Sequence, residues 1–191
     1  MMLRQTALIC GLALTIAPGA AFADAAPPRD GTYEATLDLD QDGKMDKAIV
    51  AQQPGGGPAD LAIYLSAGDG PLDPSRQPTL LKKNLTAQRI LALDSAGKGL
   101  LMVKYGCGGC SNDNETTLSI LRRGGEFLVA GFTQAWDTRN GAGGCAIDFL
   151  KGTQVVTQGL DDAKLARKRF APIKLKLADW SDEQLAKACG F

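Results

Sequence analysis

The fold class is decided by the stretch Thr116-Thr-Leu-Ser-Ile-Leu-Arg122, Arg123-Gly-Gly125, Glu126-Phe-Leu-Val-Ala-Gly-Phe132. Two runs rich in apolar and β-branched residues flank three residues that contain two glycines. Glycine adopts positive φ at little cost, and tight hairpin turns need this conformation. The stretch therefore predicts an antiparallel β-hairpin.

On both sides of this hairpin, further short apolar runs alternate with glycine-rich turns along most of the chain. The clearest alternation puts Tyr33, Ala35 and Leu37 on one face of a strand. The expected strands span residues 31–39, 47–52, 61–65, 89–93, 100–105, 145–150 and 153–157. No strand–helix alternation is present, and no fixed repeat supports a complete propeller. We expect one all-β domain over residues 31–191, with antiparallel sheets in a sandwich-like or partial propeller-like arrangement.

One or two short helices are expected near the C-terminus. Ser181-Asp182-Glu183-Gln184 has the form of a capping box, in which a serine and a glutamine satisfy each other's backbone groups. This predicts a helix that runs to about Ala188. Residues 160–169, with acidic residues followed by basic ones, could form a second helix with a charged face.

The N-terminus is typical of an export signal. Arg4 precedes an apolar run from Ala7 to Ala17, which is too short to span a bilayer of about 30 Å. Ala21-Phe22-Ala23 has the pattern of a cleavage site, so residues 1–23 are interpreted as a signal peptide and residues 24–30 as an extended leader. No later segment is long and apolar enough to cross a membrane. We expect a periplasmic or secreted protein with no membrane span after cleavage.

The composition excludes several function classes. The chain has no histidine, which removes Ser-His-Asp triads, Cys-His dyads and histidine-containing zinc sites. Lys plus Arg is 21 and Asp plus Glu is 21, so the basic excess expected of a nucleic-acid-binding protein is absent.

The strongest motif is the acidic loop, Asp38-Leu-Asp-Gln-Asp-Gly-Lys-Met-Asp46. Its carboxylates stand at alternate positions and then at the ninth, and Gly43 permits a sharp turn. Calcium prefers six to eight oxygen ligands, and the backbone carbonyl of Lys44 can add one to those of the side chains. The twelfth position is Ile49 rather than a glutamate, so the loop is not an EF-hand.

This spacing, followed by an apolar strand, resembles the calcium loops of FG-GAP and VCBS-type repeats. The resemblance implies a structural Ca²⁺ at a β-hairpin. It also implies that four carboxylates and one carbonyl bind the ion, from Asp38, Asp40, Asp42, Asp46 and Lys44. It covers about twenty residues in a single copy, and the Phe-Gly/Gly-Ala-Pro part is missing. It therefore supports a calcium loop and not a propeller. The alternative is a solvated acidic turn that is held by Asx hydrogen bonds and binds nothing.

Four cysteines remain after cleavage: Cys107, Cys110, Cys145 and Cys189. An even number in an exported protein indicates disulfides, for which three connectivities are possible. We favour Cys107 with Cys110, whose two intervening glycines relieve the tight ring, and Cys145 with Cys189. Two alternatives are a redox-active Cys-x-x-Cys pair and a four-cysteine zinc site.

The leading functional hypothesis is a non-catalytic, calcium-binding periplasmic or secreted β-protein. It would act as a binding module for an unknown protein or cell-envelope ligand, and no catalytic or cofactor-binding residue stands out. One alternative is a thiol–disulfide oxidoreductase that uses Cys107 and Cys110. Another is a cell-wall or carbohydrate hydrolase with a carboxylate pair drawn from loops.

Overall fold

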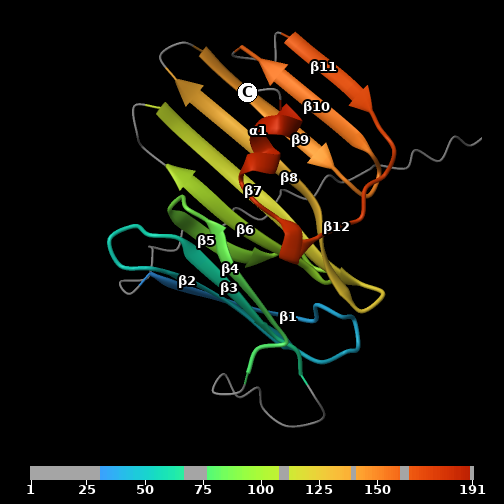
Figure 1. Ribbon diagram of the computed structural model, residues 1–191. Coiled ribbons are helices and arrows are strands. Elements are labelled where there is room, and N and C mark those ends of the chain that lie inside the picture. Colours follow the sequence, from blue (N-terminus) through green and yellow to red (C-terminus); the bar gives the residue numbers. More distant parts are fainter. Residues whose placement is uncertain (1–30, 67–76, 108–111, 139–140, 160–163, 190–191) are drawn as a thin grey trace, which may run out of the picture.

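The computed structural model describes residues 31–66, 77–107, 112–138, 141–159 and 164–189. These residues form two antiparallel sheets, which confirms the predicted all-β class (Figure 1). Within these ranges, none of the helices has the length and hydropathy that crossing a bilayer requires. The expected signal peptide and leader, residues 1–30, lie outside the described residues.

The first sheet is a four-stranded meander in the order β1-β2-β3-β4. Its strands are β1 (Thr32–Leu37), β2 (Asp46–Gln52), β3 (Ala59–Tyr64) and β4 (Leu80–Thr86). Leu37 pairs with Asp46, so the acidic loop joins the ends of β1 and β2. Buried and half-buried residues alternate along β2 and β3, because only one face of the sheet meets the core.

The second sheet is a longer meander in the order β11-β10-β9-β8-β7-β6-β5, with β12 paired to β8. Its strands are β5 (Ile90–Ser95), β6 (Leu100–Cys107), β7 (Asn112–Arg123), β8 (Glu126–Thr138), β9 (Gly141–Asp148), β10 (Thr153–Gln158), β11 (Lys164–Arg169) and β12 (Leu175–Lys176). The predicted hairpin is its centre, because β7 and β8 turn at Gly124 and Gly125, which both have positive φ.

Three strands, β4, β11 and the two-residue β12, lie outside the strand ranges that the sequence predicted. The prediction of a second helix at residues 160–169 is wrong from residue 164 onward. The strand β11 forms there instead and pairs with β10 along its whole length. Ala166 lies opposite Val156, so pairing with an exposed sheet edge outweighs the local helical pattern. The strand β4 was not predicted. Its Lys82, Lys83 and Asn84 give it a polar character, as at the edge of a sheet.

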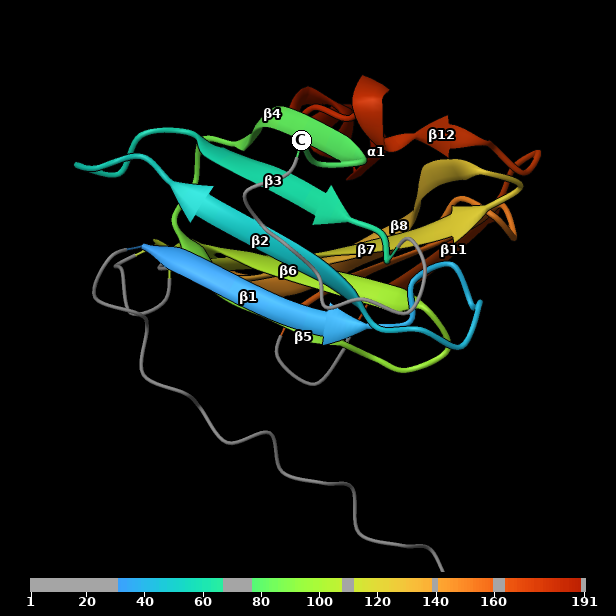
Figure 2. The same ribbon diagram turned by 90° about the horizontal axis from the view of Figure 1, so that it is seen from below.

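The core lies between the two sheets. The Tyr33 hydroxyl donates a 2.9 Å hydrogen bond to the Ile90 carbonyl, and the Ile90 N–H donates to the Gln52 side chain at 3.0 Å. These bonds hold β1 and β2 against β5, and from there the first sheet folds over one face of the second (Figure 2). One continuous cluster of buried side chains fills the space, with Phe132 close to both Phe149 and Trp180.

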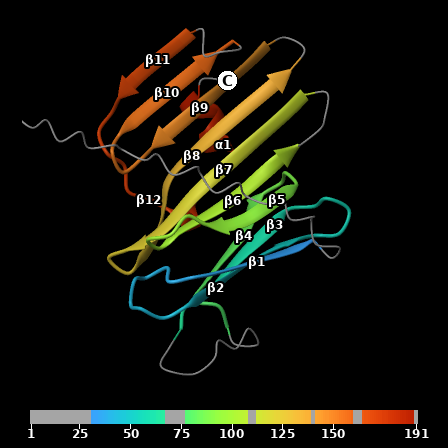
Figure 3. The same ribbon diagram turned by 180° about the vertical axis from the view of Figure 1, so that it is seen from behind.

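The C-terminal segment covers the rest of this inner face. It contains a 3-10 turn, η2 (Leu177–Asp179), and one helix, α1 (Glu183–Cys189). The Ser181 N–H donates to the Gln184 side chain at 3.2 Å, which is one half of the predicted capping box. Viewed from behind, the strands of the second sheet lie in front of α1, so the helix covers only one face (Figure 3).

Candidate metal centre

The acidic loop has the predicted strand–loop–strand setting, between the end of β1 and the start of β2. The Leu39 side chain is fully buried and joins the core. Gln41 and Gly43 both have positive φ, at 62° and 87°. The loop therefore turns sharply while Leu39 anchors it in the core.

Three of the predicted ligands lie together. Asp38, Asp40 and Asp42 each offer a carboxylate oxygen, and these oxygens lie within 4.8 Å of one another. Asp38 and Asp40 are half-buried and Asp42 is exposed. Like charges at this separation repel, and a cation placed among them relieves the repulsion.

Backbone hydrogen bonds hold the loop in its present shape. The carboxylate of Asp38 accepts the N–H groups of Asp42 and Gly43, each at 3.0 Å. Asp42 in turn accepts the N–H of Lys44 at 2.8 Å. A solvated turn would use the same bonds. They leave lone pairs on each carboxylate, however, and so they are compatible with a bound cation.

Asp40 carries the observation that points to a ligand. Its side chain is 14% exposed, and one oxygen, Oδ2, pairs with the Arg122 guanidinium at 2.9 Å. The other oxygen, Oδ1, is buried and has no hydrogen-bond partner in the described part of the chain. Burial raises the pKa of Asp40, as do the charges of Asp46 and Asp42, whereas the Arg122 charge lowers this pKa. An orphaned buried oxygen beside two other carboxylates fits the donor set of a hard cation such as calcium.

Asp46 differs from the other three carboxylates. It is completely buried, and its two oxygens accept the N–H groups of Leu39 at 2.9 Å and Ser66 at 2.8 Å. It does not belong to the group of three mutually close oxygens. Asp46 therefore has a structural role that its place in the motif did not predict, because it ties the loop to Ser66, two residues after the end of β3.

The turn between β5 and β6 packs closely against the acidic loop. The Gln41 side chain donates to the Lys98 carbonyl at 3.2 Å. A Cβ atom on Gly99, which has φ +68°, would lie 2.9 Å from the Leu39 carbonyl oxygen. The turn between β5 and β6 can approach the acidic loop this closely only because residue 99 is glycine.

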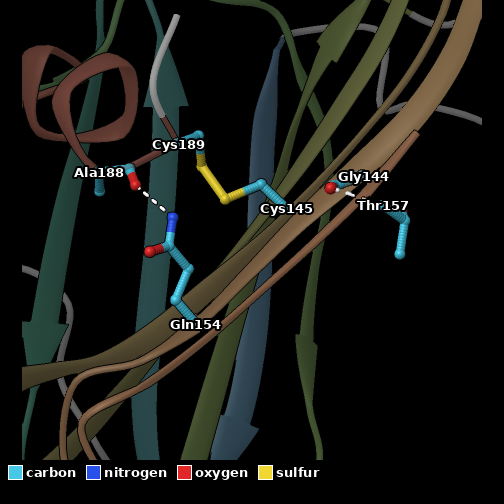
Figure 4. Close-up of a disulfide and its surroundings, with 6 residues drawn as sticks. All are labelled: Gly144, Cys145, Gln154, Thr157, Ala188 and Cys189. Carbon is cyan, nitrogen blue, oxygen red and sulfur yellow. Dashed lines mark hydrogen bonds between the residues drawn. A yellow bond between two sulfur atoms is a disulfide. The ribbon is translucent and has the colours of Figure 1, made fainter. Parts of the chain in front are cut away.

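The second predicted cysteine pair is present. Cys145 on β9 and Cys189 at the end of α1 form a disulfide with a Cα–Cα distance of 6.0 Å (Figure 4). Beside it, the Gln154 side chain donates to the Ala188 carbonyl. These two contacts hold α1 on the inner face of the second sheet.

The Cys-x-x-Cys segment begins at the end of a strand. Cys107 is the last residue of β6 and is disulfide-bonded, and its N–H donates to the Asn114 side chain at 3.3 Å. Its expected partner, Cys110, lies outside the described residues. The described chain resumes as β7. Thioredoxin-like enzymes instead place this motif where a strand leads into a helix.

Sequence reasoning missed Arg122. It lies on β7, 82 residues from Asp40 along the chain, and nothing in the local sequence connects the two. Its position in an alternating strand is typical of an ordinary residue that faces the solvent. Only the way the first sheet folds onto the second brings its guanidinium to the loop.

Comparison with known proteins adds no assignment: no protein-family model matches the chain, and no curated protein or solved structure is significantly similar to it.

Proposed function

We propose that this protein is a non-catalytic, calcium-binding β-protein of the periplasm or the extracellular space, which binds a protein or cell-envelope ligand through its loops. The ligands would be Asp38, Asp40 and Asp42, with Asp46 and the Lys44 carbonyl completing the set. The observation that carries the proposal is the orphaned, buried Oδ1 of Asp40 among the three clustered carboxylates. The disulfide between Cys145 and Cys189 is compatible with an oxidising compartment.

The proposed role of the ion is structural. Calcium would neutralise the clustered carboxylates at the junction of β1 and β2, and so stabilise the hairpin that begins the first sheet. Exported calcium modules bind at about 10⁻⁴–10⁻³ M. With a Kd of about 0.1 mM and about 1 mM free calcium, mass action adds about 1.4 kcal/mol to the free energy of unfolding. For a domain of this size the melting temperature rises by about 3–6 °C.

The test is a calorimetric calcium titration of chelator-treated protein, together with thermal melts in chelator and in calcium. Asp42→Ala removes an exposed oxygen ligand and a repelling charge, so it should lose the calcium increment without lowering the melting temperature in chelator. Asp137→Ala is the control, because Asp137 is an exposed carboxylate on β8 outside the loop. Magnesium should stabilise less, since it gives up its water ligands reluctantly. The absence of saturable heat up to about 10 mM calcium, well above this affinity range, would rule out the metal site.

A further inference from the structure

We infer that Arg122 is the internal counter-cation of the acidic loop, and that calcium must compete with its guanidinium for Asp40. This inference rests on the proposed function and concerns the regulation of the same site. Arg122 then has two effects: it lowers the affinity of the loop for calcium, and it stabilises the loop when no ion is bound.

The geometry places the arginine directly on a proposed ligand. Arg122 Nη1 lies 2.9 Å from Asp40 Oδ2, and the two side chains are only 28% and 14% exposed. Arg122 comes from β7 of the second sheet, whereas Asp40 belongs to the loop of the first sheet. The ion pair is therefore a contact between the sheets and is shielded from much of the solvent.

The other contacts of the Arg122 side chain among the described residues are weak. Its ion pair with Asp40 can therefore give way to a bond between Asp40 and calcium. Its guanidinium carbon lies 5.9 Å from the centroid of the Phe127 ring, within the range of a cation–π contact. Its Nε is buried and has no hydrogen-bond partner among the described residues. Within the described part of the chain, the guanidinium thus makes one charged contact where its planar fork could make two parallel bonds.

The charges on the loop explain why a counter-cation is needed. The carboxylate oxygens of Asp38, Asp40 and Asp42 lie within 4.8 Å of one another, so their negative charges repel. The Arg122 guanidinium, whose Nη1 lies 2.9 Å from Asp40 Oδ2, places a positive charge beside these carboxylates. A divalent ion bound by the same carboxylate would be repelled by the guanidinium, so the two cations compete.

The competition links the ion to the packing of the two sheets. When calcium binds Oδ1 of Asp40, its charge weakens the attraction between Oδ2 and Arg122, and so weakens a contact between the sheets. Calcium binding would therefore weaken one inter-sheet ion pair while it makes the β1–β2 loop more rigid. Part of the binding free energy would offset this loss, which lowers the affinity.

The experiment compares Arg122→Met with Arg123→Met by calorimetric calcium titration of the full chain. Both substitutions remove one positive charge, but Arg123 is exposed and makes no ion pair with the loop among the described residues. The methionine at 122 keeps an unbranched side chain against Phe127. Arg122→Met should bind calcium about tenfold more tightly, the order expected when a unit charge beside a divalent ion is removed in a high dielectric. Arg123→Met should stay within about twofold of the wild type, because an exposed charge is largely screened.

Two further measurements separate competition from a general change in the fold. In chelator, Arg122→Met should melt below the wild type, since Asp40 loses its counter-ion, and in calcium this difference should shrink. Arg122→Lys keeps the charge and should stay within about threefold of the wild-type affinity.

The outcomes are distinct. If the wild type binds calcium and Arg122→Met binds equally or more weakly, the competition is refuted while the proposed calcium function stands. If neither protein binds calcium, both are refuted. If only the variant binds within the titrated range, the competition is confirmed, and Arg122 keeps the wild-type site closed to calcium at those concentrations.

Discussion

The hydroxyl of Tyr105 donates a 3.1 Å hydrogen bond to the carboxylate of Asp182, which lies 77 residues further along the chain. The other oxygen of this carboxylate accepts the Thr86 hydroxyl at 2.8 Å. Thr86 belongs to the first sheet and Tyr105 to the second, so one side chain from the C-terminal segment joins both sheets. Both hydroxyl-bearing residues are buried.

Asp182→Ala should lower the free energy of unfolding by about 2–4 kcal/mol, because it leaves two buried hydroxyl groups without their acceptor. Urea denaturation measures this value. Asp179→Ala is the matched control: Asp179 is exposed in the same segment, and its loss should change stability by no more than about 0.5 kcal/mol. Equal effects of the two substitutions would show that Asp182 does not join the sheets.

Stability should fall steeply in alkaline solution because of Tyr105. Burial, together with the charge and hydrogen bond of Asp182, raises the pKa of Tyr105 well above its ordinary value. Above pH ~10 an unfolded tyrosine releases its proton, whereas Tyr105 in the folded protein keeps it. The folded state then binds more protons, so stability decreases as pH rises, by about 1.4 kcal/mol per pH unit for one such group. Tyr105→Phe should remove this part of the slope between pH 10 and 11.5, measured by urea denaturation. An unchanged slope would contradict the assignment.

Removing the disulfide through the double substitution Cys145→Ser, Cys189→Ser should lower the free energy of unfolding by about 4 kcal/mol. The two residues are 44 positions apart, and the estimate is the loop-closure entropy of the unfolded chain for a loop of that length. Equilibrium unfolding in urea without reductant is the measurement. A loss below about 1 kcal/mol would mean that the other contacts of α1 already fix the C-terminal segment.

Asp46→Asn should destabilise the protein with and without calcium. An amide presents only one acceptor oxygen, so either the buried N–H of Leu39 or the partly buried N–H of Ser66 loses its partner, at a cost of about 1–3 kcal/mol. Thermal melts in chelator measure this loss directly. Asp42→Asn serves as the comparison, since Asp42 is exposed and should not lower stability in chelator. If Asp46→Asn lowered the melting temperature only in calcium, Asp46 would be a ligand without the structural role.

The sequence alone determined the features that depend on neighbouring residues. Periodicity and turn chemistry predicted the β7–β8 hairpin, and with it the antiparallel all-β class. The aspartate spacing located a loop in which Asp38, Asp40 and Asp42 do lie close together. The cysteine count and the predicted helix were enough to favour the pairing of Cys145 with Cys189, which is present.

Tertiary structure alone decided the features that join distant segments. The strand β11 forms because the edge of β10 offers unpaired backbone groups, which no local pattern reveals. Arg122 reaches Asp40, and Asp46 turns inward to two backbone N–H groups, because the first sheet folds over the second and excludes water there. The physical reason is that periodicity reports which face of a strand is apolar, whereas the partner of a buried charge depends on which segments pack together.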